Sequence, residues 1–166
     1  KCIELGKDFN ITPYGTEAMH VLRAEKGYII VGQETDGSVT PVDLDMNWIV
    51  SKKKYDFIGK RALVRSDTVK EDRKQLVGIL TVDPSIVLEE GSQLVEVETS
   101  LPMPMVGHIT SSYYSPNLGR SIALALVKSG TKKKGVKLIV PTVHRSVEVE
   151  ITNPVCIDPE NERLMA

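Results

Sequence analysis

The fold of this chain is decided by residues 22–50, LRAEKGYIIVGQETDGSVTPVDLDMNWIV, and by residues 56–63, DFIGKRAL. A helical pattern ends at Gly27, and glycine is common just past a helix end because it tolerates a left-handed backbone. A short apolar segment, a polar turn and a Thr-Pro pair follow, and the next segment carries Trp48, the single tryptophan. We expect this unusual order of elements to identify the fold.

The composition is that of an ordinary soluble protein. Hydrophobic residues make up 41% of the 166 residues, charged residues make up 26%, and the formal net charge is -1. So small a net charge favours neither nucleic acid nor an anionic membrane as a partner. No apolar run reaches the ~18 residues of a membrane span. The length suits one domain, or one domain and half of another.

The start of the chain has no methionine and no apolar signal-peptide segment. We therefore expect a fragment of a longer protein that is located in the cytoplasm. Cys2 and Cys156 are expected to be reduced thiols, because disulfides are rare in that compartment.

The first part of the chain has helical signals. Residues 1–9 are typical of the last turns of a helix. A second helix is expected from Thr12-Pro13 to about Lys26, because a hydroxyl residue followed by proline suits a helix start.

The middle of the first part is predicted to form strands. Residues 28–31 have the composition of a short buried strand, and residues 35–38 form a turn cluster. Residues 42–48 alternate between apolar and polar side chains, which is typical of a strand with one wet face. A short helix around Leu63 follows, and Asp56 could cap it.

The character of the sequence changes at the polar segment 66–74, which is predicted to be a linker. Six β-rich runs follow it: QLVGILTV (75–82), QLVEVE (93–98), MVGHITSSYY (105–114), SIALALV (121–127), VKLIV (136–140) and VEVEIT (147–152). Short strands at such spacing indicate a small barrel or sandwich. We therefore predict an α+β chain with an α/β piece at residues 1–73 and a β module at residues 74–166.

The histidines and the lysine runs do not indicate a catalytic or metal-binding site. His20 is expected on a helix and His108 and His144 in strands, and none has the spacing of a metal ligand. Structural roles are favoured for all three. The lysine runs 52–54 and 132–134 are interpreted as solvated turns, and the alternative is a contact with an anionic tail or a partner subunit.

Three aromatic residues are placed where they could stack on a ligand, namely Trp48, Tyr113 and Tyr114. Packing in a core or an interface is the favoured interpretation of all three, because most aromatic side chains serve that purpose. The residues by themselves therefore indicate an α/β-plus-β chain without a complete active site.

The chain resembles the folate-binding aminomethyltransferase family, which includes the T-protein of the glycine cleavage system. The matching segments are YGTEAMHVLRAEKGY, VGQETDGSVTPVDLDMNW, DFIGKRAL and VGHITSSYYSPNLGRSIALALV. They occur in the family's order, and the resemblance as a whole extends from about residue 12 to residue 155. The resemblance implies part of the folate-binding domain in residues 1–73 and a small antiparallel β-barrel in residues 74–166.

Within this superfamily the sequence resembles in particular the carboxy-terminal part of the α subunits of heterotetrameric sarcosine oxidases. The resemblance implies oxidative demethylation of sarcosine to glycine, with transfer of the one-carbon unit to tetrahydrofolate and release of hydrogen peroxide. It implies β, γ and δ subunits as partners. Flavins and NAD are expected elsewhere in the complex, and the fragment alone is expected to be inactive.

The resemblance also implies the site residues. Arg23, Glu25, Tyr28 and Trp48 are expected to contact the folate. The family's catalytic Asp and pterin-binding Glu would precede this chain, so no catalytic residue is expected within it and the pocket is expected to be incomplete.

Departures from the family pattern separate the alternatives. Glycine cleavage T-proteins have an Arg-Asp pair where this chain has Met19 and His20, and a methionine cannot donate the bidentate hydrogen bonds of an arginine. Folate-binding proteins of iron–sulfur cluster maintenance have a cysteine where this chain has Tyr28, so the only thiol of that motif is missing. These two classes and a purely structural domain remain the alternatives to the oxidase.

Overall fold

The computed structural model describes residues 1–163 and residue 165. The α-helices are α1 (Cys2–Leu5) and α2 (Thr16–Glu25), and the short 3-10 helices are η1 (Lys7–Phe9), η2 (Asn47–Ile49), η3 (Lys60–Val64) and η4 (Gly130–Lys132). The strands are β1 (Lys74–Thr81), β2 (Gln93–Leu94), β3 (Gly107–Ser115), β4 (Arg120–Lys128), β5 (Lys137–Pro141) and β6 (Ser146–Thr152). None of the described helices is long and apolar enough to cross a membrane.

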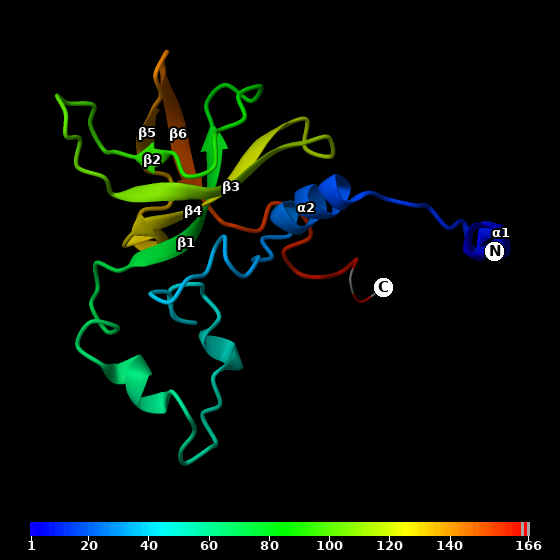
Figure 1. The fold of residues 1–166 in the computed structure, drawn as a ribbon, viewed down its shortest axis with the longest axis horizontal. Coiled ribbons are helices and arrows are strands. Elements are labelled where there is room, and N and C mark those ends of the chain that lie inside the picture. The colour runs from blue at the N-terminus through cyan, green and yellow to red at the C-terminus, as the bar shows by residue number, and fades with distance from the viewer. Residues whose placement is uncertain (164, 166) are drawn as a thin grey trace.

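The strands form one antiparallel sheet in the order β2-β3-β4-β1-β6-β5. Val95, just after β2, pairs with Ile139 of β5 through two backbone hydrogen bonds of 2.9 Å each. Because this pairing joins the two edge strands, the sheet closes into a barrel, and closure leaves few unpaired edges. The fold is therefore α+β with a small antiparallel barrel, as predicted, and Figure 1 shows α2 lying beside it.

Strand β4 shows why the barrel run SIALALV has no polar alternation. Ala123 and Ala125 point into the barrel core, whereas Leu124 and Leu126 belong to a second cluster outside the barrel that includes Leu44. Both faces of β4 are thus covered, and a strand covered on both faces is apolar throughout. The first part of the chain supplies that outer cover.

The helix α2 starts later than the sequence predicts. Its first residue is Thr16 and its N-cap is Gly15. Thr12 does not cap the helix, because its hydroxyl donates to the carbonyl of Asn10 at 3.4 Å. The predicted end is confirmed: Gly27 has a φ of 71°, and a Cβ there would lie 2.9 Å from the carbonyl oxygen of Pro154.

The two strands predicted in the first part of the chain are wrong. Residues 28–31 form only an isolated bridge between Val31 and Thr35. Residues 42–48 form a turn followed by η2, because the Asp43 carboxylate accepts hydrogen bonds from the backbone N–H and hydroxyl of Thr40, each at 2.8 Å. Such side-chain bonds replace a strand ladder with a turn.

Other local predictions also need correction. Gly59, not Asp56, is the N-cap of η3, and the Asp56 carboxylate instead accepts from the adjacent N–H of Phe57 at 2.9 Å. His144 lies in the turn between β5 and β6, not in a strand. The run 93–98 forms only the two-residue strand β2 and the bridge at Val95. The other five β-rich runs form strands as predicted.

The segment that follows β6 returns to α2. The backbone N–H groups of Cys156 and Ile157 both donate to the carbonyl of Glu25 at 2.9 Å. Lys26 and Asp158 add an ion pair of 2.9 Å. In Figure 1 this orange-to-red segment runs beneath α2, so two segments far apart in the sequence meet at the C-terminal end of the helix.

Candidate functional site

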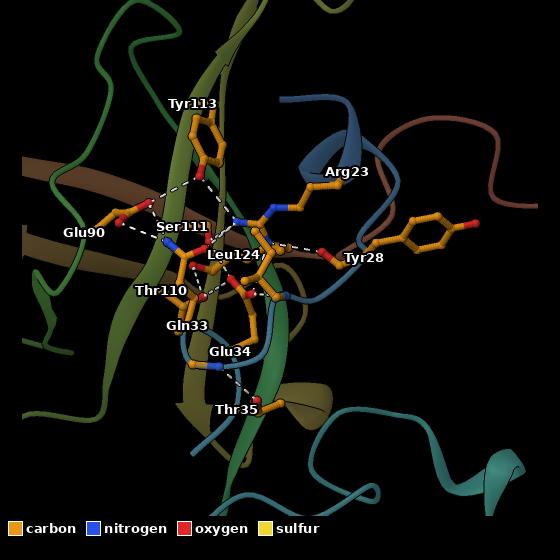
Figure 2. Close-up of polar contacts among 12 residues, drawn as sticks. Arg23, Tyr28, Gln33, Glu34, Thr35, Glu90, Thr110, Ser111, Tyr113 and Leu124 are labelled. Atoms are coloured by element: carbon orange, nitrogen blue, oxygen red, sulfur yellow. Dashed lines mark hydrogen bonds and ion pairs between the residues drawn. The ribbon is translucent and has the colours of Figure 1, made fainter. Parts of the chain in front are cut away.

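The candidate site is built where the end of α2, the loop 28–35 and strand β3 meet (Figure 2). At its centre Glu34 is completely buried, with 0% of its surface exposed. One carboxylate oxygen accepts hydrogen bonds from Thr110 at 3.0 Å and Ser111 at 2.5 Å. The other accepts from the backbone N–H of Ile30 at 2.7 Å. These bonds fix the loop onto the barrel.

A β-bulge in β3 explains how two neighbouring residues reach the same carboxylate. The pairing of β3 with β4 shifts register between Ile109 and Ser111. In a regular strand, consecutive side chains point to opposite faces, whereas a bulge redirects one of them. Thr110 and Ser111 can therefore both donate to Glu34.

Arg23 connects Glu34 to the helix. Its Nη1 donates to Glu34 at 3.0 Å and to the carbonyl of Tyr28 at 3.1 Å. Its Nη2 donates to Ser111 at 2.5 Å and to Gln33 at 3.1 Å. Figure 2 shows the guanidinium pointing into this network, and the Arg23 side chain is largely buried.

The end of α2 also holds the backbone of Tyr28. The N–H of Tyr28 donates to the carbonyl of Arg23 at 2.8 Å, and the N–H of Gly27 donates to the carbonyl of Ala24 at 3.0 Å. These two bonds form a Schellman motif. Because the Arg23 guanidinium also donates to the Tyr28 carbonyl, both the N–H and the C=O of Tyr28 are hydrogen-bonded to Arg23.

The surroundings of Glu34 favour the ionised form of its carboxylate. Burial raises the pKa of Glu34. Hydrogen bonds from Ile30 and Ser111 and the charge of Arg23 together lower this pKa by more than burial raises it, so the pKa lies below its ordinary value of 4.5. The carboxylate is therefore ionised at neutral pH despite its burial.

Glu25 holds a different part of the barrel. Its carboxylate is buried and accepts hydrogen bonds from Ser115 at 2.5 Å and from the side-chain amide of Asn117 at 2.9 Å. These two residues lie at the end of β3 and in the turn that follows it. Glu25 thus fixes the β3–β4 turn against the end of α2.

The predicted site residues line two neighbouring cavities. Arg23, Glu25 and Tyr28 line the first, of about 460 Å³, together with the half-exposed Met19. Tyr28 also lines the second, of about 450 Å³, with Trp48. Tyr28 is 51% exposed and Trp48 is 79% exposed, so their rings are free to contact a ligand. Arg23 and Glu25 instead direct their charged groups into the protein.

The sequence did not reveal Glu34 as a site residue. Gln33 and Glu34 belong to the matching segment VGQETDGSVTPVDLDMNW, which indicates a family but assigns Glu34 no role. A glutamate in a loop is usually exposed, so only its partners on β3 show that it is buried. His20 stacks on Tyr113 with the ring centroids 6.4 Å apart, which agrees with the structural role predicted for it.

A second buried carboxylate, that of Asp43, pairs with Arg73 at 2.5 Å and is not part of this network. Across residues 1–163 and 165, no group of three or more His, Cys, Asp or Glu side chains could hold a metal ion. His108 lies on β3 with its ring nitrogen 3.4 Å from the Lys74 amine. Burial and the Lys74 charge lower its pKa. Cys2 and Cys156 are free thiols in the described structure.

Two protein-family models match this chain. Residues 74–158 match the glycine cleavage T-protein C-terminal barrel domain. The chain belongs to that family. Residues 1–54 match the GCVT N-terminal domain, so the T-protein resemblance extends over the segment that carries α2 and Glu34.

Curated relatives of this T-protein barrel chain include two kinds of protein. Sarcosine oxidase subunit alpha of Corynebacterium sp. (strain P-1) is 55% identical over 161 residues, which cover 95% of this chain and 16% of the relative. Sarcosine oxidase subunit alpha of Rhizobium meliloti (strain 1021) is 41% identical, covering 98% and 17%. Aminomethyltransferase of Thermotoga neapolitana is 33% identical, covering 90% and 38%. The chain thus spans a small part of each of these relatives.

A solved structure agrees with the fold. The glycine cleavage system aminomethyltransferase T from Bartonella henselae superposes with a TM-score of 0.79 over 95% of this chain and 43% of that chain. Sequence identity in this comparison is 20%, so the likeness concerns the fold alone.

Proposed function

We propose that this chain is part of a sarcosine oxidase α subunit and forms one wall of its folate site. The complex would oxidatively demethylate sarcosine to glycine and transfer the one-carbon unit to tetrahydrofolate. The observation that carries the proposal is identity of 55% and 41% to two sarcosine oxidase α subunits over nearly the whole chain. Aminomethyltransferases, at 33% identity, are less similar.

The residues around Tyr28 fit a folate. Ligand sites are mostly apolar cavities with a few polar groups that set orientation, and flat ring systems pack well on exposed aromatic side chains. The first cavity combines Tyr14, Met19, Leu22 and Tyr28 with the polar groups of Asn117. When bound, tetrahydrofolate would supply a nucleophilic amine that accepts the one-carbon unit.

In this proposal the four predicted residues have two roles. Tyr28 and Trp48 contact the folate, because their rings are exposed beside the cavities. Arg23 and Glu25 are positioning residues, because their charged groups are bound to Glu34 and to Ser115 and act on the ligand only through the backbone they hold. The chain would contribute to rate by orientation and by exclusion of water, which can supply several kcal/mol.

The remaining parts of the proposal rest on the relatives. Each sarcosine oxidase relative is named as a subunit, which supports an assembly of several chains, and we propose β, γ and δ subunits as the partners. Flavins and NAD would bind elsewhere in that assembly, and the cytoplasm is its proposed location. We also propose that residues 1–73 and 74–166 belong to separate domains.

A second candidate is a glycine cleavage aminomethyltransferase. The fold match to such an enzyme and the 33% identity to another support it. Met19 counts against it, because this side chain lines the first cavity where those proteins are expected to place an arginine. The two candidates share folate and differ in the donor of the one-carbon unit.

Calorimetric titration of folinic acid into the intact complex and into residues 1–166 tests the proposal. We expect tight binding by the complex and weak binding by residues 1–166, because the family's pterin-binding Glu is expected outside this chain. Absence of binding by the complex would refute the folate site. Equal affinity of both samples would refute the incomplete pocket.

Substitutions in the intact complex test the two contacts. Y28A and W48A should each weaken folinic acid binding about fivefold, since a stacked ring contributes roughly 1 kcal/mol. Y114A is the matched control, because Tyr114 is about as exposed as Tyr28 but lines neither cavity. Turnover with sarcosine, compared with turnover of a glycine cleavage donor, separates the two candidate enzymes.

A further inference from the structure

The segment 49–65, which we call the basic arm, differs in charge from the rest of the chain. It holds six lysine or arginine residues and one aspartate, which gives a formal charge of +5. The net charge of the whole chain is -1, so the residues outside the arm carry -6. Such an asymmetry creates a local positive field that attracts an acidic surface.

The basic arm extends away from the barrel. Figure 1 shows it in cyan to green, below the sheet and separate from α2. Tyr55 and Ile58 are almost fully exposed, and Val64 is exposed as well. A segment that combines exposed apolar side chains with a concentrated charge has the composition expected of an interaction surface.

The two lysine runs, which look alike in the sequence, differ in the structure. In the run 132–134, Lys132 pairs with Glu71 at 3.0 Å and Lys133 pairs with Glu96 at 2.6 Å. In the run 52–54, no lysine lies within ion-pair distance of a carboxylate anywhere in the described part of the chain. Within the described residues Arg65 of the arm pairs with Asp67 at 3.5 Å, but the charges of Lys52, Lys53 and Lys54 are not neutralised by this chain.

The arm also contains a cavity of about 410 Å³. Lys54 lies at this cavity, and the apolar side chains that line it include Ile49, Val50, Phe57, Ile58 and Leu63. A concave apolar site bordered by charge suits an inserted side chain, which is the usual anchor of a protein interface. A flat lipid surface cannot fill such a cavity.

We propose that the basic arm binds an acidic face of a separate protein subunit, which inserts an apolar side chain into this cavity. The inference rests on the proposed function, because that function places the chain in an assembly of several subunits. The partner's carboxylates would pair with Lys52, Lys53 and Lys54. Charge pairs at an interface accelerate association and select the partner, whereas the inserted side chain supplies affinity.

Zero-length carbodiimide cross-linking of the intact purified assembly tests the location of the partner. This reagent joins an amine to a carboxylate that it already contacts, and mass spectrometry then identifies both residues. We expect Lys52, Lys53 or Lys54 to be joined to Asp or Glu of a different subunit. Cross-links only within the same polypeptide, only to a second copy of it, or none at all would overturn the proposal, as would purification without a second subunit.

Reassembly of the subunits tests the energetics. K52E/K53E/K54E should weaken subunit association at least 30-fold, and I58S should weaken it about tenfold. K132E/K133E/K134E introduces the same charge change outside the arm and should alter association less than threefold. Equal effects of the two triple variants would overturn the proposal.

Binding of folinic acid by the variants separates this inference from the proposed function. Both arm variants should keep the folinic acid affinity of the unaltered protein, because the arm lies outside the two cavities beside Tyr28. If the variants dissociate from the partner and still bind folinic acid, both ideas stand. If association is unaffected while folinic acid binds normally, only the docking proposal fails. Binding of anionic vesicles that is abolished by K52E/K53E/K54E, with subunit association unchanged, would replace the protein partner with a membrane.

Discussion

Glu34 is an acid that the protein buries completely and keeps ionised. One oxygen of its carboxylate accepts from Arg23 and from the backbone N–H of Ile30, and the other accepts from two hydroxyl groups on β3. Removal of water from a charge costs several kcal/mol, so a buried ion must have a close counter-ion and a full set of hydrogen bonds. Arg23 suits this position because its planar guanidinium serves several acceptors at once. The pair holds the loop that presents Tyr28.

The E34A substitution should destabilise the protein by about 3 kcal/mol, because it leaves the Arg23 guanidinium buried without its counter-ion. The measurement is the free energy of unfolding in urea. E90Q is the control, since Glu90 lies at the exposed end of the same network and, within the described residues, accepts from Gln33 and Tyr113 alone. It should cost less than about 1 kcal/mol. Similar losses in the two variants would contradict the central role of Glu34.

The pH dependence of stability should report the same carboxylate. Its pKa in the folded state is lower than its ordinary value of 4.5, so its contribution is complete above pH 4.5 and is lost as the pH falls through the folded-state pKa. We expect the stability difference between the unaltered protein and E34Q to be constant from pH 7 to pH 5 and to shrink below pH 4.5. A difference that stays constant down to pH 3 would contradict this assignment.

At the scale of elements, the sequence predicted the barrel far better than the first part of the chain. The β-rich runs become strands because their apolar residues are buried by neighbouring strands on both sides. The run 42–48 shows the same alternation, but Asp43 bonds to Thr40 and to Arg73, and these contacts form a turn. Alternation alone cannot distinguish the two cases, since the partner Arg73 lies 30 residues away.

The site was predictable only in part for the same reason. Resemblance indicated Arg23, Glu25 and Tyr28, and the structure places all three beside one cavity. It could not indicate Glu34, whose role depends on Ser111, 77 residues further along the chain and turned toward it by a bulge. No local pattern encodes such a contact. A contact between distant residues appears only once the sheet register is known.

Close packing of β1 against the segment after β6 gives a prediction about a glycine. A Cβ at Gly78 would lie 2.1 Å from the backbone oxygen of Asn153. G78A should therefore destabilise the protein by about 3 kcal/mol, because backbone must move to make room. G37A is the matched control, since a Cβ at Gly37 meets nothing within 4 Å, and it should change stability by less than about 0.5 kcal/mol. Thermal unfolding of the two variants measures the contrast.

At the scale of the whole molecule, the barrel has its own closed hydrogen-bond network and its own core, whereas the first part of the chain has little core of its own. Most of the large apolar residues before β1 are exposed. The exception is the cluster around Leu44, which is buried against Leu76, Leu124 and Leu126 of the barrel. The first part therefore depends on the barrel for its burial, and the reverse dependence is weaker.

Residues 74–166 expressed alone should fold cooperatively, because the pairing of Val95 with Ile139 closes the sheet without help from the first part. The unfolding midpoint should be lower than that of residues 1–166, since Leu76, Leu124 and Leu126 lose their cover. Circular dichroism during thermal unfolding measures both. Residues 1–73 alone should show no cooperative transition. A cooperative transition in 1–73, or none in 74–166, would refute the proposed division.

The bonds between Glu25 and residues 156–157 have a consequence for synthesis of the protein on the ribosome. Helix α2 is translated early, but the carbonyl of Glu25 receives its donors only when Cys156 and Ile157 have left the exit tunnel. Until then the end of α2, next to Tyr28, lacks the two hydrogen bonds that the backbone of residues 156 and 157 donates in the folded protein. The surface that we propose to face the folate is thus completed after the barrel, and a chain released before residue 156 would carry α2 without these two hydrogen bonds.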